Sequence, residues 1–327
     1  MEKMSGRNAL NVALDELLAL DEKVICIGED IGPAGGCWGY FMGLQSKYGK
    51  ERVIQTPISE MGYTGVANGL AYGGYRPIVE FMFADFATMA ADPIINMAAK
   101  ARYNSNGKLN LPITYIFPEG GGGQSGCQHS QSVEAWFANV PGLKLVAPTT
   151  PEDLRYFLKA SVLDDDPVCF FFSRTCAMIK SAEIEREDKV IPSLRNAAKI
   201  VKEGNDLTVV AWHRPLYAAI EAAREVEEET GKSIEIIDPR VLCPLDEEKI
   251  YASVRKTGRI VICNEAPERG SFAMLISALI AENCLGSLKK PVARVGGYNT
   301  CIPFGAVEEY AFPQKSDIKN AMMEILK

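Results

Sequence analysis

Residues 9–29, ALNVALDELLALDEKVICIGE, carry two hydrophobic patterns, one after the other. From Ala9 to Leu18 apolar side chains recur every three or four positions, which is typical of a helix with one buried face. Ser5, just before this pattern, is the expected N-cap. Residues 24–27 are an unbroken apolar run, which is typical of a short strand buried on both faces. The stretch therefore predicts a helix that leads into a buried strand.

The same alternation continues along the rest of the chain. Further short apolar runs, spaced far enough apart for a helix between them, lie at 77–83, 111–117, 143–147 and 168–172. Later in the chain the expected strands are 207–212, 234–237, 260–264 and 291–295, and the expected helices are 215–229, 245–256, 270–284 and 317–326. Because alternating strands and helices form parallel sheets covered on both faces, we predict an α/β protein.

Two domains are expected within this α/β class. The 327 residues, 47% of them hydrophobic, exceed one average domain and can fill two cores. From 181 to 189 charged residues replace the apolar periodicity. We therefore place the first domain at 1–180, a linker at 181–192 and the second domain at 193–327, and we expect a mostly parallel sheet with helices on both faces in each domain.

Composition excludes several classes of partner and site. The formal net charge of −7 is spread over both halves without a basic block, which argues against a nucleic-acid partner. The first 20 residues have no uninterrupted apolar core, so neither a signal peptide nor a membrane span is expected. The nine cysteines contain no Cys-x-x-Cys pair, so we expect buried, reduced thiols, no metal site and a soluble cytoplasmic protein.

Segment 53–73 is expected to leave a strand and enter a helix, with Glu60 at the turn. A carboxylate in the first turn is favoured by the helix dipole, and the local pattern alone predicts no more than that. Gly65, Gly69 and Gly73 fall four apart, on one helix face. Because each glycine inside a helix costs about 1 kcal/mol relative to alanine, the stripe indicates that another backbone or a ligand approaches closely. Tight packing inside the same domain explains the stripe equally well.

Two other segments hold candidate residues. Residues 80–86, EFMFADF, end a strand with clustered aromatic side chains and are by themselves typical of a core. Residues 118–131 join a glycine run to the sequence QHSQ, and a histidine on a glycine-rich loop makes His129 a candidate for proton transfer. The other histidine, His213, is expected to be structural or at the surface. The spacings of a nucleophile elbow, a P-loop and a dinucleotide-binding glycine motif are not found.

Several sequence blocks occur in the order of one known family, and the chain resembles the β subunits of the pyruvate, branched-chain 2-oxo-acid and acetoin dehydrogenase complexes. The resemblance runs from about residue 7 to residue 327. Its blocks are GED at 28–30, TPISE at 56–60, RP at 76–77, EFMFADF at 80–86, QHSQ at 128–131, PGLK at 141–144, DDDP at 164–167 and NEAP at 264–267. It implies a transketolase-like pyrimidine-binding domain, a transketolase C-terminal domain and a lipoamide acyl-transferring 2-oxo-acid dehydrogenase. Pyruvate is the expected substrate, with branched-chain 2-oxo acids and acetoin as alternatives.

The resemblance also implies roles for single residues around thiamine diphosphate. The glutamate matching Glu60 hydrogen-bonds a ring nitrogen of the cofactor's aminopyrimidine and promotes the tautomer that takes the proton from the thiazolium carbon. Phe86 is expected against that ring and Glu29 near the cofactor. His129 is expected on the substrate side, where it helps proton transfer or the approach of the lipoyl group. Glu60 and His129 are thus the expected catalytic residues, and Glu29, Glu60 and Phe86 the expected cofactor-binding residues.

The resemblance implies a partner as well. The family holds the cofactor's diphosphate and Mg²⁺ with a Gly-Asp-Gly motif, and this chain contains none. We therefore expect an α subunit that holds the Mg²⁺, a cofactor at the interface of an α2β2 heterotetramer, a glycine stripe at a subunit contact and a lipoyl acyltransferase as the next component. One alternative is the C-terminal half of a split transketolase, whose glutamate has a Gly-Ile-Ala-Glu-like context unlike TPISE. Another is a non-catalytic assembly subunit, which would need neither Glu60 nor His129.

The chain departs from the family pattern at three single positions and in the segment FSRT at 172–175, which differs from the usual acidic or basic end of that strand. Phe117 stands where an arginine is common, His213 where a glycine is common, and Asn264 where many members have a histidine. These differences bear on substrate identity and on docking. The sequence leaves both open, as it does the binding of a structural monovalent cation.

Overall fold

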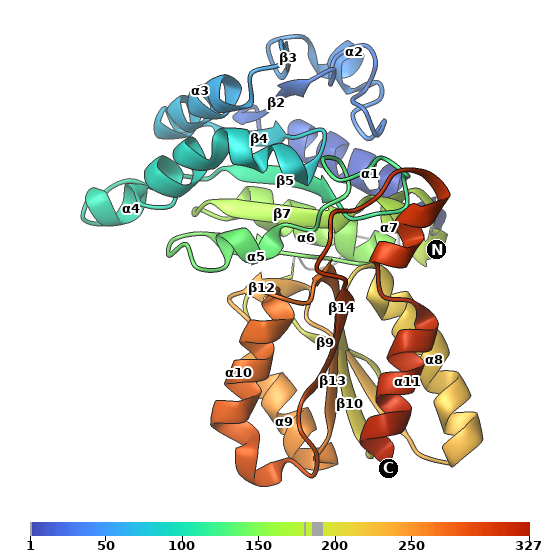
Figure 1. Cartoon of the computed structure of the whole chain (residues 1–327). Coiled ribbons are helices and arrows are strands. Elements are labelled where there is room, and N and C mark those ends of the chain that lie inside the picture. Colours follow the sequence, from blue (N-terminus) through green and yellow to red (C-terminus); the bar gives the residue numbers. More distant parts are fainter. Residues whose placement is uncertain (1, 180, 185–191) are drawn as a thin grey trace. The chain divides into compact units, whose positions relative to one another are not determined.

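The computed structural model describes residues 2–179, 181–184 and 192–327, which form two compact units (Figure 1). The first unit contains Met1–Glu119 and Trp136–Leu194, and the second contains Gly120–Ala135 and Arg195–Lys327. The loop Gly120–Ala135 therefore belongs to the second unit by its contacts, although a strand of the first unit leads into it.

The first unit is built on a parallel sheet. Its strands lie in the order β6-β7-β5-β4-β2-β3, and each neighbouring pair is parallel. Every residue of β2, β5 and β7 is buried, as the unbroken apolar runs predict. The bounds are β2 (Val24–Glu29), β3 (Val53–Thr56), β4 (Arg76–Glu80), β5 (Thr114–Glu119), β6 (Lys144–Val146) and β7 (Val168–Ser173).

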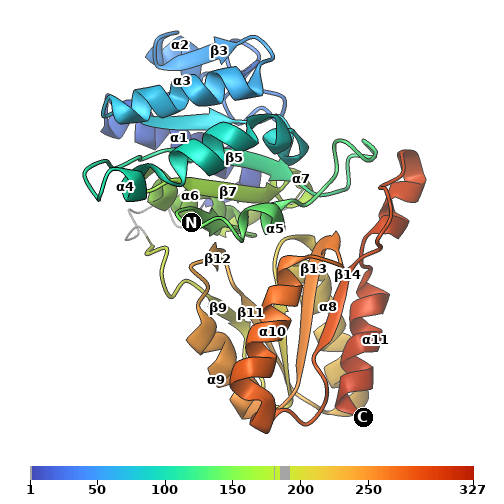
Figure 2. The same cartoon turned by 60° about the vertical axis from the view of Figure 1, so that its left-hand side comes forward.

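Helices cover both faces of this sheet (Figures 1 and 2). On one face α1 (Gly6–Leu20) packs against α6 (Pro151–Leu163), and Ser5 caps α1 as expected, because its Oγ accepts a hydrogen bond from the Asn8 N–H at 3.3 Å. On the other, α3 (Glu60–Tyr72) packs on β4 with the 3₁₀ helix η1 (Ala84–Ala90) and the π-helix η2 (Asp92–Ala98). The shorter elements are α2 (Leu44–Tyr48), α4 (Ala101–Asn104), α5 (Glu134–Phe137), α7 (Arg174–Ile179) and the antiparallel pair β1 (Glu2–Ser5) and β8 (Ser181–Ile184).

The second unit repeats this architecture around the sheet order β14-β13-β10-β11-β9. All neighbouring strands are parallel except the edge strand β9, which is antiparallel to β11. Helices α8 and α11 cover one face and α9 and α10 the other (Figure 1). The bounds are β9 (Lys199–Lys202), β10 (Leu207–Ala211), α8 (Arg214–Thr230), β11 (Ile234–Asp238), β12 (Val241–Cys243), α9 (Glu247–Thr257), β13 (Ile260–Pro267), α10 (Phe272–Cys284), η3 (Leu285–Ser287), β14 (Ala293–Gly297), η4 (Gly305–Ala311) and α11 (Lys315–Leu326).

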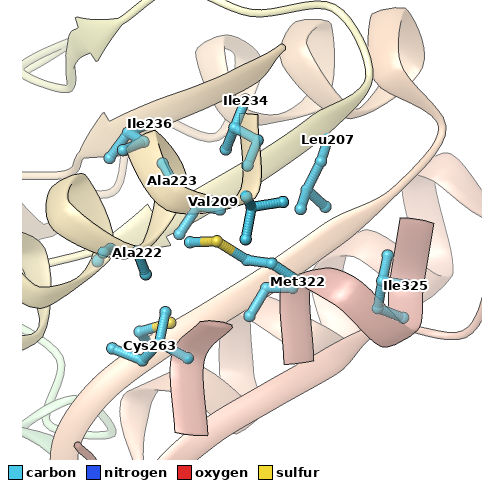
Figure 3. Close-up of a cluster of buried hydrophobic side chains, with 14 of the residues drawn as sticks. Leu207, Val209, Ala222, Ala223, Ile234, Ile236, Cys263, Met322 and Ile325 are labelled. Atoms are coloured by element: carbon cyan, nitrogen blue, oxygen red, sulfur yellow. The ribbon is translucent and has the colours of Figure 1, made fainter. Parts of the chain in front are cut away.

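A core of the second unit lies between its sheet and the helix pair α8 and α11 (Figure 3). The small side chains Ala222 and Ala223 of α8 let α11 approach closely, so that fully buried Met322 reaches the sheet residue Val209. Burying a side chain of this size contributes about 1.5–3 kcal/mol, so this packing fixes α11 and the segment that leads into it.

The predicted class, two α/β units with mostly parallel sheets, is confirmed, while some elements differ. Strand β13 continues past the predicted end to Pro267, because Pro267 pairs with Gly297 beyond an irregularity in the ladder. Strand β9 was missed, since KIVK is too short and too charged at its ends to stand out. The predicted linker begins with strand β8, and its residues 185–191 lie outside the described residues. The domain boundaries stay a prediction.

The expectation about cysteines is confirmed in part. All nine are free, and five of them are buried. Cys37 and Cys301 are exposed, so the prediction of uniformly buried thiols is wrong for these two. No helix within the described ranges has both the length and the apolar character needed to cross a bilayer.

Candidate functional site

Three carboxyl groups meet at one edge of the first unit's sheet. Glu29 is the last residue of β2, Glu80 is the last residue of β4, and α3 begins at Glu60. Strand β2 lies between β4 and β3, and its register places Gly28 opposite Glu80 and Glu29 opposite Thr56. The carboxyl ends of parallel strands share an edge. The structure thus brings the predicted residues Glu29 and Glu60 together and adds Glu80, which sequence reasoning missed.

Glu29 and Glu60 form a buried acidic pair, with exposed fractions of 3% and 8%. Burial raises the pKa of Glu29, and the charge of Glu60 raises it further, while a hydrogen bond from the Ser59 backbone N–H partly opposes them. Glu29 Oε1 and Thr56 Oγ1 are buried and have no hydrogen-bond partner among the described residues. Because buried acceptors without donors are costly, this edge is suited to a ligand that brings hydrogen-bond donors.

Glu80 is the most deeply buried member of the cluster. The Tyr40 hydroxyl donates to its Oε1 at 3.0 Å, whereas its Oε2 has no partner within the described part of the chain. Burial raises the pKa of Glu80 to about 8, with Glu29 adding to the rise and the Tyr40 hydrogen bond opposing it. The side chain is therefore largely protonated at neutral pH. A Cβ at position 28 would lie 2.9 Å from the Glu80 carbonyl oxygen, so this position of β2 requires glycine.

Tyr63 links α3 to the end of β4, next to these carboxyl groups. Its hydroxyl donates to the Glu80 carbonyl oxygen at 3.4 Å, and the ring is 3% exposed. Burial raises the pKa of Tyr63, and Glu29, Glu60 and Glu80 raise it further. One phenol therefore lies within the electrostatic reach of all three carboxyl groups and keeps its proton.

Phe86 ends a row of aromatic rings in the same unit. Its half-buried ring meets Phe83 edge to face at 5.6 Å between centroids, and Phe83 meets Trp38 in the same way at 5.3 Å. The Arg174 guanidinium lies 5.1 Å from the centroids of both Trp38 and Phe83. Such cation–π contacts are worth about 0.5–2 kcal/mol each and fix the row that ends at Phe86.

His129 belongs to the second unit, because it lies in the loop Gly120–Ala135. Its backbone N–H donates to the Gly126 carbonyl oxygen at 3.3 Å, which places it in a turn of that loop. Glu29, Glu60 and Phe86 belong to the first unit. The four predicted site residues are thus divided between the units, three in the first and one in the second.

The three single-position departures from the family occupy buried positions. Phe117 packs in an aromatic cluster, with centroids 4.7 Å from Phe81 and 5.1 Å from Phe171. Asn264 is buried and its Nδ2 donates to the Ala266 carbonyl oxygen at 3.2 Å. His213 is 1% exposed at the N-cap of α8 with a φ of 55°, so the structural alternative holds and the surface alternative is wrong.

The outer face of α3 is not covered by any of the described residues. A Cβ built on Gly65 or Gly69 meets no other atom within 4 Å, whereas Gly73 is the C-cap of the helix. Met61 and Val66, on the same helix, are 60% and 58% exposed. Tight packing inside the same domain therefore does not explain Gly65 and Gly69, and the face is free for another chain.

Two surface grooves of the first unit bear on the position of the site. One of about 540 Å³ lies beside the acidic edge and is lined by residues that include Gln45, Gln55 and Thr56. A larger one of about 1060 Å³, between α4 and the strand β6, contains none of the predicted site residues. The described residues contain no group of three or more His, Cys, Asp or Glu placed to hold a metal ion.

Comparisons with known proteins place both units in known families of domain. Residues 2–178 match the transketolase pyrimidine-binding domain, and residues 196–318 match the transketolase C-terminal domain. The chain is 38% identical to the 2-oxoisovalerate dehydrogenase subunit beta of Bacillus subtilis, over 99% of both chains. It is 42% identical to the mitochondrial pyruvate dehydrogenase E1 component subunit beta-1 of Arabidopsis thaliana, over 98% of this chain and 88% of that protein.

Two further proteins bear on the assignment. The acetoin:2,6-dichlorophenolindophenol oxidoreductase subunit beta of Bacillus subtilis is 39% identical, over 99% of this chain and 97% of that protein. Among solved structures, an inactive beta4 tetramer of a split-gene transketolase superposes with a TM-score of 0.77 at 25% identity, covering 99% of this chain and 98% of that one.

The raised pKa of Glu80 predicts a specific pH dependence of stability. The folded protein holds the Glu80 proton more tightly than the unfolded chain, whose glutamate has a pKa near 4.5, so the stabilisation is complete below pH 4.5 and is lost as pH rises through about 8. Glu80→Gln cannot titrate. Between pH 6 and pH 9 the unfolding free energy of the wild type, measured by urea denaturation, should therefore fall by about 2–3 kcal/mol more than that of Glu80→Gln.

The matched control is the exposed Glu51→Gln, which should follow the wild-type pH dependence. An identical loss for wild type and Glu80→Gln across this interval would show that Glu80 does not titrate there.

Proposed function

The chain belongs to the transketolase-like family that contains the β subunits of the pyruvate, 2-oxoisovalerate and acetoin dehydrogenases, and from this premise we propose that it is the β subunit of a thiamine-diphosphate-dependent 2-oxo-acid dehydrogenase. The observation that carries the proposal is the buried pair Glu29 and Glu60 at the carboxyl edge of the pyrimidine-binding domain. Glu29 Oε1, which has no partner among the described residues, can accept a hydrogen bond from a ligand with an amino group, such as an aminopyrimidine.

In this proposal the residues of the chain act on the pyrimidine end of the cofactor. Bound thiamine diphosphate supplies a thiazolium carbon that adds to the 2-oxo carbon and an electron sink for decarboxylation. Glu60 would share a proton with a ring nitrogen of the aminopyrimidine, and Glu29, whose pKa is raised by burial and by the charge of Glu60, lies beside it. Phe86 would lie against the ring, and His129 would move a proton on the substrate side or guide the lipoyl group.

The partner is an α subunit that holds the diphosphate and Mg²⁺. The chain contains no Gly-Asp-Gly motif, and the relatives named above are themselves called subunits. The uncovered face of α3 supplies a contact surface, since Gly65 and Gly69 let another backbone approach. We propose an α2β2 heterotetramer that passes its acyl group to a lipoyl acyltransferase.

Pyruvate is the proposed substrate, and branched-chain 2-oxo acids and acetoin are the alternatives. Relatives named for pyruvate are 38% to 42% identical, two named for 2-oxoisovalerate are 38% and 42% identical, and one named for acetoin is 39% identical, so sequence identity supports all three substrates about equally. A split transketolase half is the second candidate and is supported by the TM-score of 0.77, but its identity is only 25%. A purely structural subunit has no use for a buried acidic pair. The cytoplasmic location stays a prediction.

Glu60→Gln tests the catalytic proposal. Glutamine can still hydrogen-bond the ring nitrogen but cannot share a proton with it. Turnover of the complex reconstituted with the α subunit should fall by about 10²-fold or more, with a smaller change in apparent substrate affinity. Exchange of the thiazolium proton for deuterium in D₂O, quenched at set times and measured by NMR, should slow in parallel.

His129→Ala is the contrasting variant. It should impair substrate turnover or acyl transfer to lipoamide and leave thiazolium exchange nearly intact. If Glu60→Gln exchanges that proton at the wild-type rate, Glu60 is an ordinary first-turn helix residue and the catalytic proposal fails.

Gly69→Leu tests the subunit contact. Leucine places a branched side chain on the uncovered face of α3, where overpacking against a partner typically costs 1–3 kcal/mol. The lone chain should be no less stable, because leucine has the higher helix propensity by roughly 0.8 kcal/mol. Size-exclusion chromatography should therefore show weaker assembly without loss of folding.

Gly286→Leu is the matched control, because its side chain also enters open space but on the second unit. Unchanged assembly of Gly69→Leu, with full activity in the reconstituted complex, would show that α3 does not lie in the interface.

A further inference from the structure

The loop that carries His129 has a backbone conformation that is costly to maintain. Gly120, Gly122 and Gly126 have φ values of 84°, 94° and 79°, and the non-glycine Gln124 has a φ of 55°. The Gly120 N–H donates to the Gln131 carbonyl oxygen at 3.1 Å, which closes the loop at its base. Between these ends the chain has no strand or helix, so its backbone amides need partners from elsewhere.

A single carboxylate accepts hydrogen bonds from three of these amides. Glu308 Oε2 accepts hydrogen bonds from the backbone N–H groups of Gly122 at 2.8 Å and Gln124 at 2.9 Å. Its Oε1 accepts from the Ser125 backbone N–H at 3.2 Å and from Ser130 Oγ at 2.8 Å. Glu308 lies on η4, far along the chain from the loop but in the same unit, and is 2% exposed.

The four donors keep Glu308 charged. Burial alone raises the pKa of this carboxyl, but the hydrogen bonds from Ser130 and from three backbone amides outweigh it and lower the pKa below its ordinary value. Hydrogen bonds to an ionised acceptor are about twice as strong as those between neutral groups. Glu308 therefore holds the loop with charge-assisted bonds at neutral pH.

The rest of this region fits around the same anchor. A Cβ on Gly126 would lie 2.5 Å from the Phe304 ring, and one on Gly121 would lie 2.1 Å from the Phe312 ring. Ser125 forms a β-bridge with Phe304. The Gly121 N–H donates to Glu265 at 2.8 Å. The glycines of the loop thus allow it to lie directly on the residues that flank η4.

His129 lies inside the part of the loop that Glu308 holds. Ser125 and Ser130, on either side of it in the chain, both donate to Glu308 Oε1. The His129 N–H also bonds Gly126 within this span. Loss of the carboxylate would leave four donors without their acceptor. The backbone that positions the imidazole would then no longer be held.

We infer that Glu308 is a positioning residue for His129: its carboxylate holds residues 122–130 in the conformation that presents the imidazole for the acyl-transfer half of the reaction. The inference rests on the proposed function for the role of His129, whereas the anchoring itself does not. Glu308 touches neither substrate nor cofactor in this account and acts only through the loop.

The first measurement is independent of activity. Amide hydrogen exchange of the peptide covering residues 120–131 is followed by mass spectrometry in the full chain, for wild type, Glu308→Gln and the exposed neighbour Glu309→Gln as control. Glu308→Gln should exchange this peptide at least about 10-fold faster, and Glu309→Gln should match the wild type. Should Glu308→Gln fold poorly, Ser130→Ala, which removes one of the four bonds, should show a smaller increase.

The second measurement uses the reconstituted complex with the α subunit. Glu308→Gln should lower turnover by about 10-fold to 100-fold, the scale of a small misplacement, while thiazolium proton exchange stays at the wild-type rate. A general structural defect would slow that exchange too. Combined with His129→Ala, Glu308→Gln should add little further loss, because both changes act on one imidazole.

Three outcomes overturn the inference. Unchanged amide exchange in both Glu308→Gln and Ser130→Ala would show that the carboxylate does not hold the loop. Losses that add fully in the double variant would show that Glu308 acts apart from His129. Full turnover of both Glu308→Gln and His129→Ala, with a looser loop, would locate the failure in the proposed role of His129 rather than in the anchoring.

Discussion

The burial of carboxyl groups at the edge of the first sheet is the constraint on which the rest of that unit depends. Parallel strands bring Glu29 and Glu80 to one edge, and the helix that begins at Glu60 adds a third acid. Like charges out of water repel and are poorly solvated, so such groups shift their pKa values or need donors. The Tyr40 hydroxyl supplies part of this need at Glu80, and protonation of Glu80 supplies more. What stays unsatisfied on Glu29 is the feature that a cofactor ring or a partner chain would complete.

The second unit uses a buried carboxylate in the opposite way. Glu308 has four donors on its two oxygens, so its pKa falls although it is as deeply buried as Glu29. A carboxylate whose oxygens all accept hydrogen bonds from the chain can hold a loop in place, whereas one with an unbonded oxygen can still accept hydrogen bonds from a ligand. The two units therefore differ in their buried acids: the first has the acids for which cofactor binding is proposed, and the second has the carboxylate that bonds the loop of His129.

The sequence predicted the local structure well and the long-range contacts poorly. Helix α1 with its Ser5 cap and the buried strands follow from periodicity, since each pattern lies within one segment. Glu60 is different: its local pattern indicated only a first-turn residue, and the resemblance to a family of known chemistry singled it out. Glu80 was read as part of an apolar strand end, because nothing local marks a buried acid. Glu308 was missed because its four donors lie 178 to 186 residues away, a pairing that no periodicity encodes.

In the proposed function this chain is the half of a cofactor site that binds the pyrimidine ring, so cofactor binding is the most direct test. Thiamine diphosphate with Mg²⁺ is titrated calorimetrically into the lone chain and into the complex formed with its α subunit. Because the chain offers acids to the ring but no Gly-Asp-Gly motif for the diphosphate, the lone chain should give no heat of binding at cofactor concentrations up to about 100 μM. The complex should bind with a Kd of about 10 μM or lower. Equally tight binding by the lone chain would contradict the account, since the whole cofactor site would then lie within this one polypeptide.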